Sequence, residues 1–314
     1  MFSFIKNLNN INLIIMKTTL QLKKVLVFIT IGIVSTSLFA QTNVENFDYP
    51  ASTLLTDPSI GFTEKTNTPS IDVYSPGLEY SGLAVSGVGR AARVNISEDG
   101  DSDPQTFGPE RIARKPFFAS SVSSGTVYMS FLANIKTTIG GDFNNFFIAV
   151  SDFNSDRLRG RVMAKDDGSG KVQFGFTKGF SSDINWTSDL YDYNKTYLFV
   201  VKYEFVAGSD NDVASLFVFD QGVDGVPASE PLTPTLTAND GTGSDLANIK
   251  IIHLRQRKVE TVVDGIALGT SWSDVIVASS LSVNSTSKNQ NSIKVYQERN
   301  YINVIVDGAG LASK

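Results

Sequence analysis

The chain has 314 residues, with 27 Lys and Arg against 32 Asp and Glu, so its formal net charge is −5. The absence of cysteine excludes disulfides, thiolate zinc sites, iron–sulfur clusters and cysteine nucleophiles. An acidic chain without concentrated Lys and Arg is also a poor candidate for binding nucleic acid, whose phosphates require such clusters.

The N-terminal residues have the three zones of a cleavable signal peptide. A basic flank ends at Lys24, an apolar core covers residues 25–34, and a small-residue segment ends at Ala40. A membrane-spanning helix needs about 20 apolar residues, so this core is too short for a permanent anchor. We therefore expect residues 1–40 to be removed, with Met16 as a candidate start, and the rest to be exported through the periplasm. The alternative is an uncleaved N-terminal anchor.

The exported part has the pattern of β-structure throughout. Apolar segments rich in Val, Ile, Phe and Tyr alternate with short connecting segments rich in Gly, Asp, Asn and Ser, and the sequence lacks the periodicity of amphipathic helices. The apolar residues of 197–205 are nearly continuous, which predicts a central strand covered on both faces. Residues 166–170 and 208–212 have the composition of turns between neighbouring strands. The predicted strands cover residues 127–135, 146–151, 159–164, 172–177, 197–205, 213–219, 249–255 and 261–268.

Many strands at roughly ten-residue spacing predict an all-β fold, an antiparallel β-sandwich or jelly roll. This domain covers residues 41–279. The Ser- and Asn-rich residues 280–292 have the composition of a flexible linker. Residues 293–314 begin with another strand-like segment but are too few for a second core.

Four segments give the exported part a family resemblance. Residues 263–275 (VDGIALGTSWSDV) resemble the last strand in a family of secreted Bacteroidetes proteins with a concanavalin-like, laminin-G-like sandwich. Residues 45–50, 124–128 and 196–203 agree with this resemblance. It implies the architecture and little about activity, because members of the family are mostly uncharacterised.

The C-terminal tail resembles the opening of a type A sorting domain, the signal read by the type IX secretion system of the same phylum. Such domains usually open with Tyr-Pro-Asn-Pro, whereas here Tyr296 is followed by Gln-Glu-Arg-Asn, and the second half is missing. The resemblance implies a truncated or diverged signal, the secretion machinery as a partner, and a destination at the outer cell surface or in the medium. The alternative is an ordinary edge strand after the linker.

An acidic loop is a candidate calcium site. Asp99, Asp101, Asp103 and Glu110 occupy positions 1, 3, 5 and 12 of a loop, which is the spacing of calcium-binding loops. Pro104 stands where such loops need glycine for a sharp turn. The alternative is a solvated acidic loop without a metal.

His253, the only histidine, is a candidate general base, or a residue of polysaccharide-lyase chemistry together with a tyrosine. No other residue of a recognisable lyase arrangement accompanies it, which favours a structural or surface role. Strand alternation places it on one face with Ile251 and Arg255.

Two small basic groups alternate in strand-like segments, Arg157, Arg159 and Arg161 in one and Arg255, Arg257 and Lys258 in the other. We expect each group to be a solvated strand face rather than an anion site.

Three aromatic residues are candidates for stacking against a sugar ring, because a pyranose has an apolar face and polar edges. Trp186 and Tyr191 lie in a loop-like stretch, and Trp272 follows the last predicted strand of the sandwich. The alternative for each is packing in the core or at its rim.

These features favour a non-catalytic binding protein over an enzyme. The sequence has no Glu-x-Asp-x-x-Glu pattern of sandwich glycosidases and no Gly-x-Ser-x-Gly nucleophile motif. We expect a secreted or surface-displayed protein that contacts glycans or matrix polymers, by analogy with lectin-type sandwiches. The alternatives are a polysaccharide-degrading hydrolase or lyase on the same jelly roll, and a structural or adhesive surface component.

Overall fold

The computed structural model describes residues 43–66, 69–96, 111–140, 146–152, 157–179, 184–238 and 245–278, together with the backbone of two further strands at 292–298 and 301–307. The predicted signal peptide (1–40) and the acidic loop with Asp99, Asp101, Asp103 and Glu110 lie outside these residues, as does the predicted linker (280–292) except for its last residue, which begins a strand. In the described part, no helix is long and apolar enough to cross a membrane.

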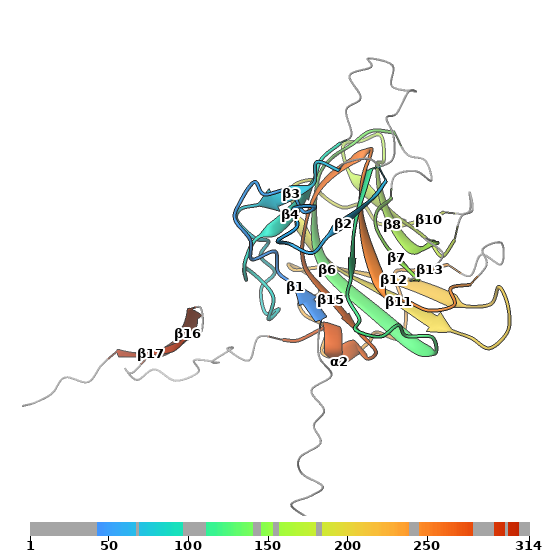
Figure 1. The fold of residues 1–314 in the computed structure, drawn as a ribbon. Coiled ribbons are helices and arrows are strands. Elements are labelled where there is room, and N and C mark those ends of the chain that lie inside the picture. The colour runs from blue at the N-terminus through green and yellow to red at the C-terminus, as the bar shows by residue number, and fades with distance from the viewer. Residues whose placement is uncertain are drawn as a thin grey trace, which may run out of the picture. The chain divides into compact units, whose positions relative to one another are not determined.

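Two antiparallel β-sheets lie face to face (Figure 1). The eight-stranded sheet has the order β13 (Leu236–Ala238), β12 (Val213–Asp220), β11 (Thr196–Phe205), β6 (Gly125–Thr138), β15 (Val259–Gly269), β4 (Ala91–Val94) and β3 (Asp72–Tyr74), and β1 (Asn43–Glu45) also pairs with β15. The seven-stranded sheet has the order β10 (Asn185–Trp186), β9 (Val172–Thr177), β8 (Leu158–Asp166), β7 (Phe146–Ser151), β14 (Ile251–Gln256), β5 (Arg111–Pro116) and β2 (Thr63–Thr66).

This topology confirms the predicted all-β fold, an antiparallel β-sandwich. All eight predicted strands are present, as β6 to β9, β11, β12, β14 and β15, with ends that differ by a few residues. The remaining strands of the sandwich have two to six residues each, too few for an alternating pattern to stand out from the loops around them.

Strand β11 lies between β6 and β12 and is covered on both faces. Phe199 and Val201 belong to the core between the two sheets, whereas Leu198 and Val200 pack in a second apolar cluster on the outer side. The nearly continuous apolar sequence of β11 follows from this double burial, and the prediction of a central strand is confirmed.

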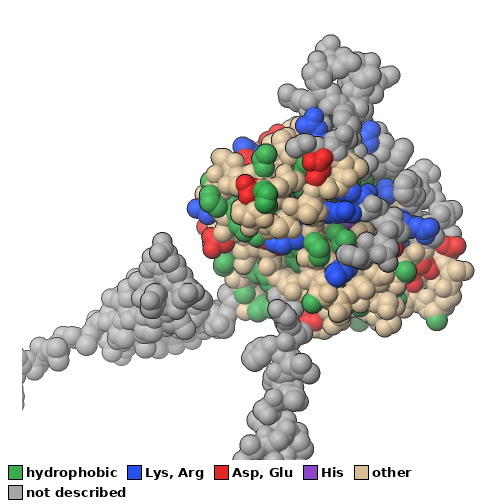
Figure 2. All heavy atoms as spheres, viewed as in Figure 1, with side chains coloured by type: hydrophobic (Ala, Val, Ile, Leu, Met, Phe, Trp, Pro, Cys, Tyr) green, Lys and Arg blue, Asp and Glu red, His purple; other side chains and the backbone are tan. Residues whose placement is uncertain are grey.

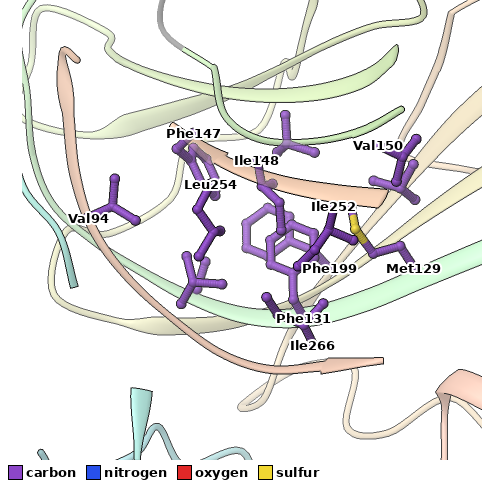
Figure 3. Packing of buried hydrophobic residues seen from close by; sticks show 14 of the residues in the cluster. Val94, Met129, Phe131, Phe147, Ile148, Val150, Phe199, Ile252, Leu254 and Ile266 are labelled. Carbon is purple, nitrogen blue, oxygen red and sulfur yellow. The ribbon is translucent and has the colours of Figure 1, made fainter. Parts of the chain in front are cut away.

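The main core fills the space between the sheets (Figure 3). Phe131 of β6 and Phe199 of β11 stack with ring centres 5.1 Å apart and planes 2° apart. Phe147 of β7 meets Phe131 edge to face at 6.2 Å, which joins the two sheets. Ring pairs of this kind add about 0.5–1.5 kcal/mol each to the free energy of burial.

The predicted turns are also confirmed. Gly168 and Gly170, between β8 and β9, have φ values of 89° and 84°, and the carboxylate of Asp167 accepts the backbone amide of Ser169. Gly208 and Asp210, between β11 and β12, have φ values of 132° and 58°. Only glycine and a few polar residues adopt this region at low cost.

The outer face of the eight-stranded sheet is covered by the chain's own residues. Leu78, Tyr80 and Leu83 from the loop after β3 pack there, as does Trp272 from the short helix α2 (Trp272–Val275). On the outer side of the seven-stranded sheet, a third and smaller apolar cluster consists of Ile112, Phe146, Ala149, Leu158 and Met163. Strands β16 (Ser292–Glu298) and β17 (Tyr301–Asp307) pair with each other as an antiparallel hairpin.

Candidate functional site

Basic and aromatic side chains occupy the outer face of the seven-stranded sheet. Ile252 and Leu254 of β14 point into the main core, so the alternation of the strand directs His253 and Arg255 outward. Arg114 of β5 is the cross-strand partner of His253 and shares its face. We call one set of residues on this outer face the basic face. It consists of Lys65, Arg114, Phe146, Arg161, Lys165, Trp186, His253 and Arg255.

Phe146 lies between two guanidinium groups. The Cζ of Arg255 is 4.1 Å from the centre of the Phe146 ring, and the Cζ of Arg161 is 4.8 Å from the same centre. All three side chains are almost completely buried. Stacking of this kind fixes a planar guanidinium in place, and each contact contributes about 0.5–2 kcal/mol.

His253 and Ser151 form a second buried pair on this face. The Nε2 of His253 is 2.7 Å from the Oγ of Ser151, and both side chains are fully buried. Burial, with smaller contributions from Lys65 and Arg114, holds the pKa of His253 well below its usual 6.5. The imidazole is therefore neutral at physiological pH.

Trp186 lies at the edge of the sheet, on β10. A methyl group built on Gly175 of the adjacent β9 would lie 2.7 Å from the indole Cζ3, so the benzenoid ring packs directly over this glycine. The Nζ of Lys165 is 4.2 Å from the ring centre. Trp186, Lys165 and the neighbouring Gln173 are half-buried, so this corner of the face is accessible from solvent.

The prediction that the two basic groups are solvated strand faces is wrong for most of their members. Arg159 and Arg161 are 2% and 6% exposed, and Arg255 and Lys258 are 2% and 5% exposed. Arg257 is half-buried, and Arg157 is exposed. The physical reason is the strand order β8, β7, β14, which brings Arg161 and Arg255 from the two strands that flank β7 into contact with one ring.

Tyr191 lies five residues after Trp186 but in a different environment. Its ring packs on the core residues Phe174 and Tyr197, with centres 4.6 and 5.1 Å away. It also lines an open cavity of about 450 Å³ together with Asp189 and Asp220. Burial and the nearby Asp189 raise the pKa of Tyr191 to about 12, so its hydroxyl stays protonated.

Trp272, on helix α2, packs against the eight-stranded sheet. Its ring meets Phe217, Tyr128 and Phe219 edge to face at 5.3, 6.0 and 6.2 Å, and it is 8% exposed. Trp272 is therefore packed in an apolar cluster, which is the alternative to sugar stacking that the sequence left open. The structure packs it against a different sheet from the one that carries Trp186.

Within the described residues, no group of three or more His, Asp and Glu side chains is arranged to hold a metal ion. The calcium loop lies outside those residues, so calcium binding stays a prediction.

Sequence reasoning missed Phe146, Gly175 and Lys165 as members of the site. Each lies inside or beside a predicted strand. The alternation of side chains along these strands could have placed the three residues on the outer face of the sheet. What the sequence lacks is the pairing that places the three strands β7, β8 and β9 next to one another.

The sequence matches no protein-family model and no curated protein. Among solved structures, the chain is similar to the cellulose-induced protein Cip1, with 11% identity and a TM-score of 0.41 over 73% of this chain and 97% of that chain. It is also similar to the catalytic domain of the glycoside hydrolase family 131 protein from Coprinopsis cinerea, with 12% identity and a TM-score of 0.38 over 76% and 86% of the two chains. The metal-free carbohydrate recognition domain of Emp46p has 9% identity and a TM-score of 0.35 over 74% and 97%. Likenesses at this level say nothing about the activity of this chain, and the fold assignment rests on its own sheet topology.

Proposed function

We propose that this protein is a non-catalytic glycan-binding protein, secreted or displayed at the cell surface, and that Trp186 is its stacking platform. The observation that carries the proposal is the indole ring of Trp186, held over Gly175 at an accessible corner of the basic face. A sugar ring can place its apolar face on such an indole while its hydroxyl groups reach the polar side chains beside it.

The polar side chains needed for this are present. Lys165 and Gln173 are cross-strand partners on β8 and β9, and the Nζ of Lys165 lies over the ring of Trp186. The Nε2 of Gln173 donates to the carbonyl oxygen of Thr187 at 2.9 Å, which fixes the orientation of the amide. A fixed amide and an ammonium group beside an aromatic ring suit the hydroxyl and ring oxygens of a sugar.

The geometry supports binding better than catalysis. Ser151 and His253 are a hydrogen-bonded pair with the chemistry of a nucleophile and a base, and both are fully buried. A nucleophile must reach the reacting atom of its substrate, which this arrangement does not allow. The proposal includes secretion or surface display because the sequence predicts a signal peptide and resembles a sorting domain in its C-terminal tail.

A glycan array with the purified chain tests this function. We expect binding to at least one glycan without release of shorter products. Trp186→Ala should weaken that binding about tenfold or more, and Trp186→Phe should retain most of it, because a planar ring remains. Tyr74→Ala removes a half-buried ring from β3 of the other sheet and serves as the matched control.

Three results would contradict the proposal. Depolymerised substrate would favour the hydrolase or lyase alternative. Self-association without binding to any glycan would favour a structural or adhesive component. Binding that Trp186→Ala leaves unchanged would place the site elsewhere on the molecule.

A further inference from the structure

A cavity of about 450 Å³ lies at the edge of the sandwich, between one edge strand of each sheet. Its volume lies within the range of small-molecule sites, roughly 300–1,000 Å³. Residues 187–191, which follow β10, form one wall, and residues 233–235, which precede β13, form the other together with the end of β12. The Nδ2 of Asn185 on β10 donates to the carbonyl oxygen of Thr237 on β13 at 2.6 Å, which joins the two edges.

Among the described residues, three carboxylates and no Lys or Arg line this cavity. Asp220 is already paired, because its Oδ2 accepts the Nζ of Lys195 at 2.6 Å. One oxygen of Asp224 accepts the backbone amide of Asp220. The carboxylate of Asp189, by contrast, has no hydrogen-bond or ion-pair partner within the described part of the chain. An ionised carboxylate can only accept hydrogen bonds, so the ligand groups opposite Asp189 must be donors.

The hydroxyl of Tyr191 is a second polar group that the cavity leaves free. The ring is fixed against Phe174 and Tyr197, and none of the described residues forms a hydrogen bond with its oxygen. Burial and, after it, the carboxylate of Asp189 raise the pKa of this hydroxyl to about 12, so it stays protonated and can donate. The influence of Asp189 also shows that the two free groups lie close together.

Apolar side chains border these polar groups. Leu190 and Val223 line the cavity and are 49% and 82% exposed, and Pro234 beside them is half-buried. Free acceptors and donors next to exposed apolar side chains match a ligand that has both hydroxyl groups and apolar C–H surface. A sugar ring has this combination.

From these observations we propose that the cavity binds one uncharged sugar unit, with Asp189 accepting from its hydroxyl groups and Tyr191 donating to one of its oxygens. This inference rests on the glycan-binding function proposed above and adds a second contact site to it. The cavity lies next to the Trp186 platform, because Thr187, which lines the cavity, directly follows Trp186 in the chain. One glycan chain can therefore place one unit on the indole ring and another in the cavity.

Charge determines which sugar units the cavity accepts. Figure 2 shows Asp and Glu side chains on the side of the surface where β12 and β13 are labelled in Figure 1. A unit with a carboxylate or sulfate group would bring a like charge to three aspartates, of which only Asp220 contacts a cation among the described residues. Like charges in contact are strongly unfavourable, so an acidic unit should be rejected.

The experiment compares short oligosaccharides of equal length that differ in charge. Calorimetry measures binding of the full chain to cello-, manno- and galacto-oligosaccharides and to oligogalacturonate. We expect at least one of the three neutral series to bind about tenfold or more tightly than oligogalacturonate. Because the ligand is uncharged, its affinity should change less than about twofold between about 50 and about 500 mM NaCl.

Two variants assign this binding to the cavity. Asp189→Asn should weaken binding of the neutral oligosaccharide about tenfold, because hydrogen bonds to a charged acceptor are lost. It should also narrow the difference from oligogalacturonate, because a repelling charge is removed, and a merely structural role would not produce this change. Tyr191→Phe keeps the ring packing and should weaken binding severalfold through the lost hydroxyl.

Asp210→Asn and Tyr193→Phe are the matched controls and should leave the affinity unchanged. Asp210 is exposed in the turn between β11 and β12, and the hydroxyl of Tyr193 bonds to Thr138 and Asp166, none of which lines the cavity. Melting curves show whether each variant keeps the fold. Asp189 is exposed, so Asp189→Asn tests the inference even if Tyr191→Phe is unstable.

The outcomes separate the two proposals. Binding that Trp186→Ala weakens, but that Asp189→Asn and Tyr191→Phe leave unchanged, would overturn this inference and leave the glycan-binding function standing. Tighter binding of oligogalacturonate than of every neutral oligosaccharide would have the same meaning. Failure of any glycan to bind would overturn both.

Discussion

Arg255 and Phe146 are in direct contact on the outer face of the sandwich, with the guanidinium carbon 4.1 Å from the ring centre, although more than one hundred residues separate them in the sequence. Arg161 contacts the same ring at 4.8 Å. One phenylalanine therefore contacts a residue from each of the two basic segments of the chain.

This contact predicts a measurable coupling energy. In a double-mutant cycle with Phe146→Leu and Arg255→Met, we expect a coupling free energy of unfolding of about 0.5–2 kcal/mol, because the contact is desolvated. Urea denaturation of the four proteins measures it. A coupling near zero would mean that the ring only fills space between the two side chains.

A glycine at the edge of the sheet supports the proposed platform. We expect Gly175→Ala to displace the Trp186 ring, because the added methyl group would lie 2.7 Å from it, and to weaken glycan binding about tenfold. Gly222→Ala is the control, since its methyl group would meet only Asp220 at 3.5 Å. Tryptophan fluorescence reports the displacement, and unchanged fluorescence and affinity in Gly175→Ala would refute the role of Gly175.

The buried His253 predicts a loss of stability in acid. Its pKa is lowered in the folded state, so the unfolded chain binds a proton near pH 6.5 that the folded chain excludes. By itself, this contribution makes the free energy of unfolding fall as the pH drops below about 6.5, by at most about 1.4 kcal/mol per pH unit. The carboxyl group of Asp264 titrates with the opposite effect over the same range, so the slope is measured by chemical denaturation of Asp264→Asn between pH 7 and 5.

The matched variant for this prediction is His253→Gln, which keeps a hydrogen-bonding group opposite Ser151 but cannot be protonated. When it is added to Asp264→Asn, we expect this change to make the free energy of unfolding depend less steeply on pH in this range. Since His253 is the only histidine, an equally steep slope in the variant would assign the acid sensitivity to carboxylates.

Asp264 predicts the opposite dependence on pH. Its carboxyl group is fully buried on β15, and burial raises its pKa to about 8, against the lowering effect of the backbone amides of Leu78 and Gly265, each 2.7 Å away. A raised carboxyl pKa stabilises the folded state below about pH 3.8, and this contribution is lost as the pH rises towards 8.

His253→Gln leaves no histidine in the chain, so in that background the range from pH 6.5 to 8 isolates Asp264. We expect the free energy of unfolding to fall across this range in His253→Gln and to stay flat when Asp264→Asn is added, which keeps one acceptor oxygen for the two amides. A double variant with the same slope as His253→Gln would show that Asp264 is ionised throughout.

The alternation of apolar residues was enough to locate the long strands and to class the fold as a sandwich. Strand β9 is an example. Val172, Phe174 and Phe176 face the core, so the alternation can be recognised from the six residues of this strand alone. The central place of β11 followed in the same way from its own composition, because burial on both faces requires apolar residues at successive positions.

The site required information that no single segment contains. The sequence identified Trp186 and Trp272 as equivalent candidates, yet one lies over Gly175 on the seven-stranded sheet and the other packs under three aromatic rings on the eight-stranded sheet. The basic residues Arg161 and Arg255 had the pattern of solvated strand faces, and only the pairing of β7 with β8 and β14 buries them against Phe146. Alternation is a property of neighbours in the chain, so the sequence by itself determined the strands and the class of fold. Which strands become neighbours depends on pairing between distant segments, so the tertiary structure alone decided where charge and aromatic rings meet.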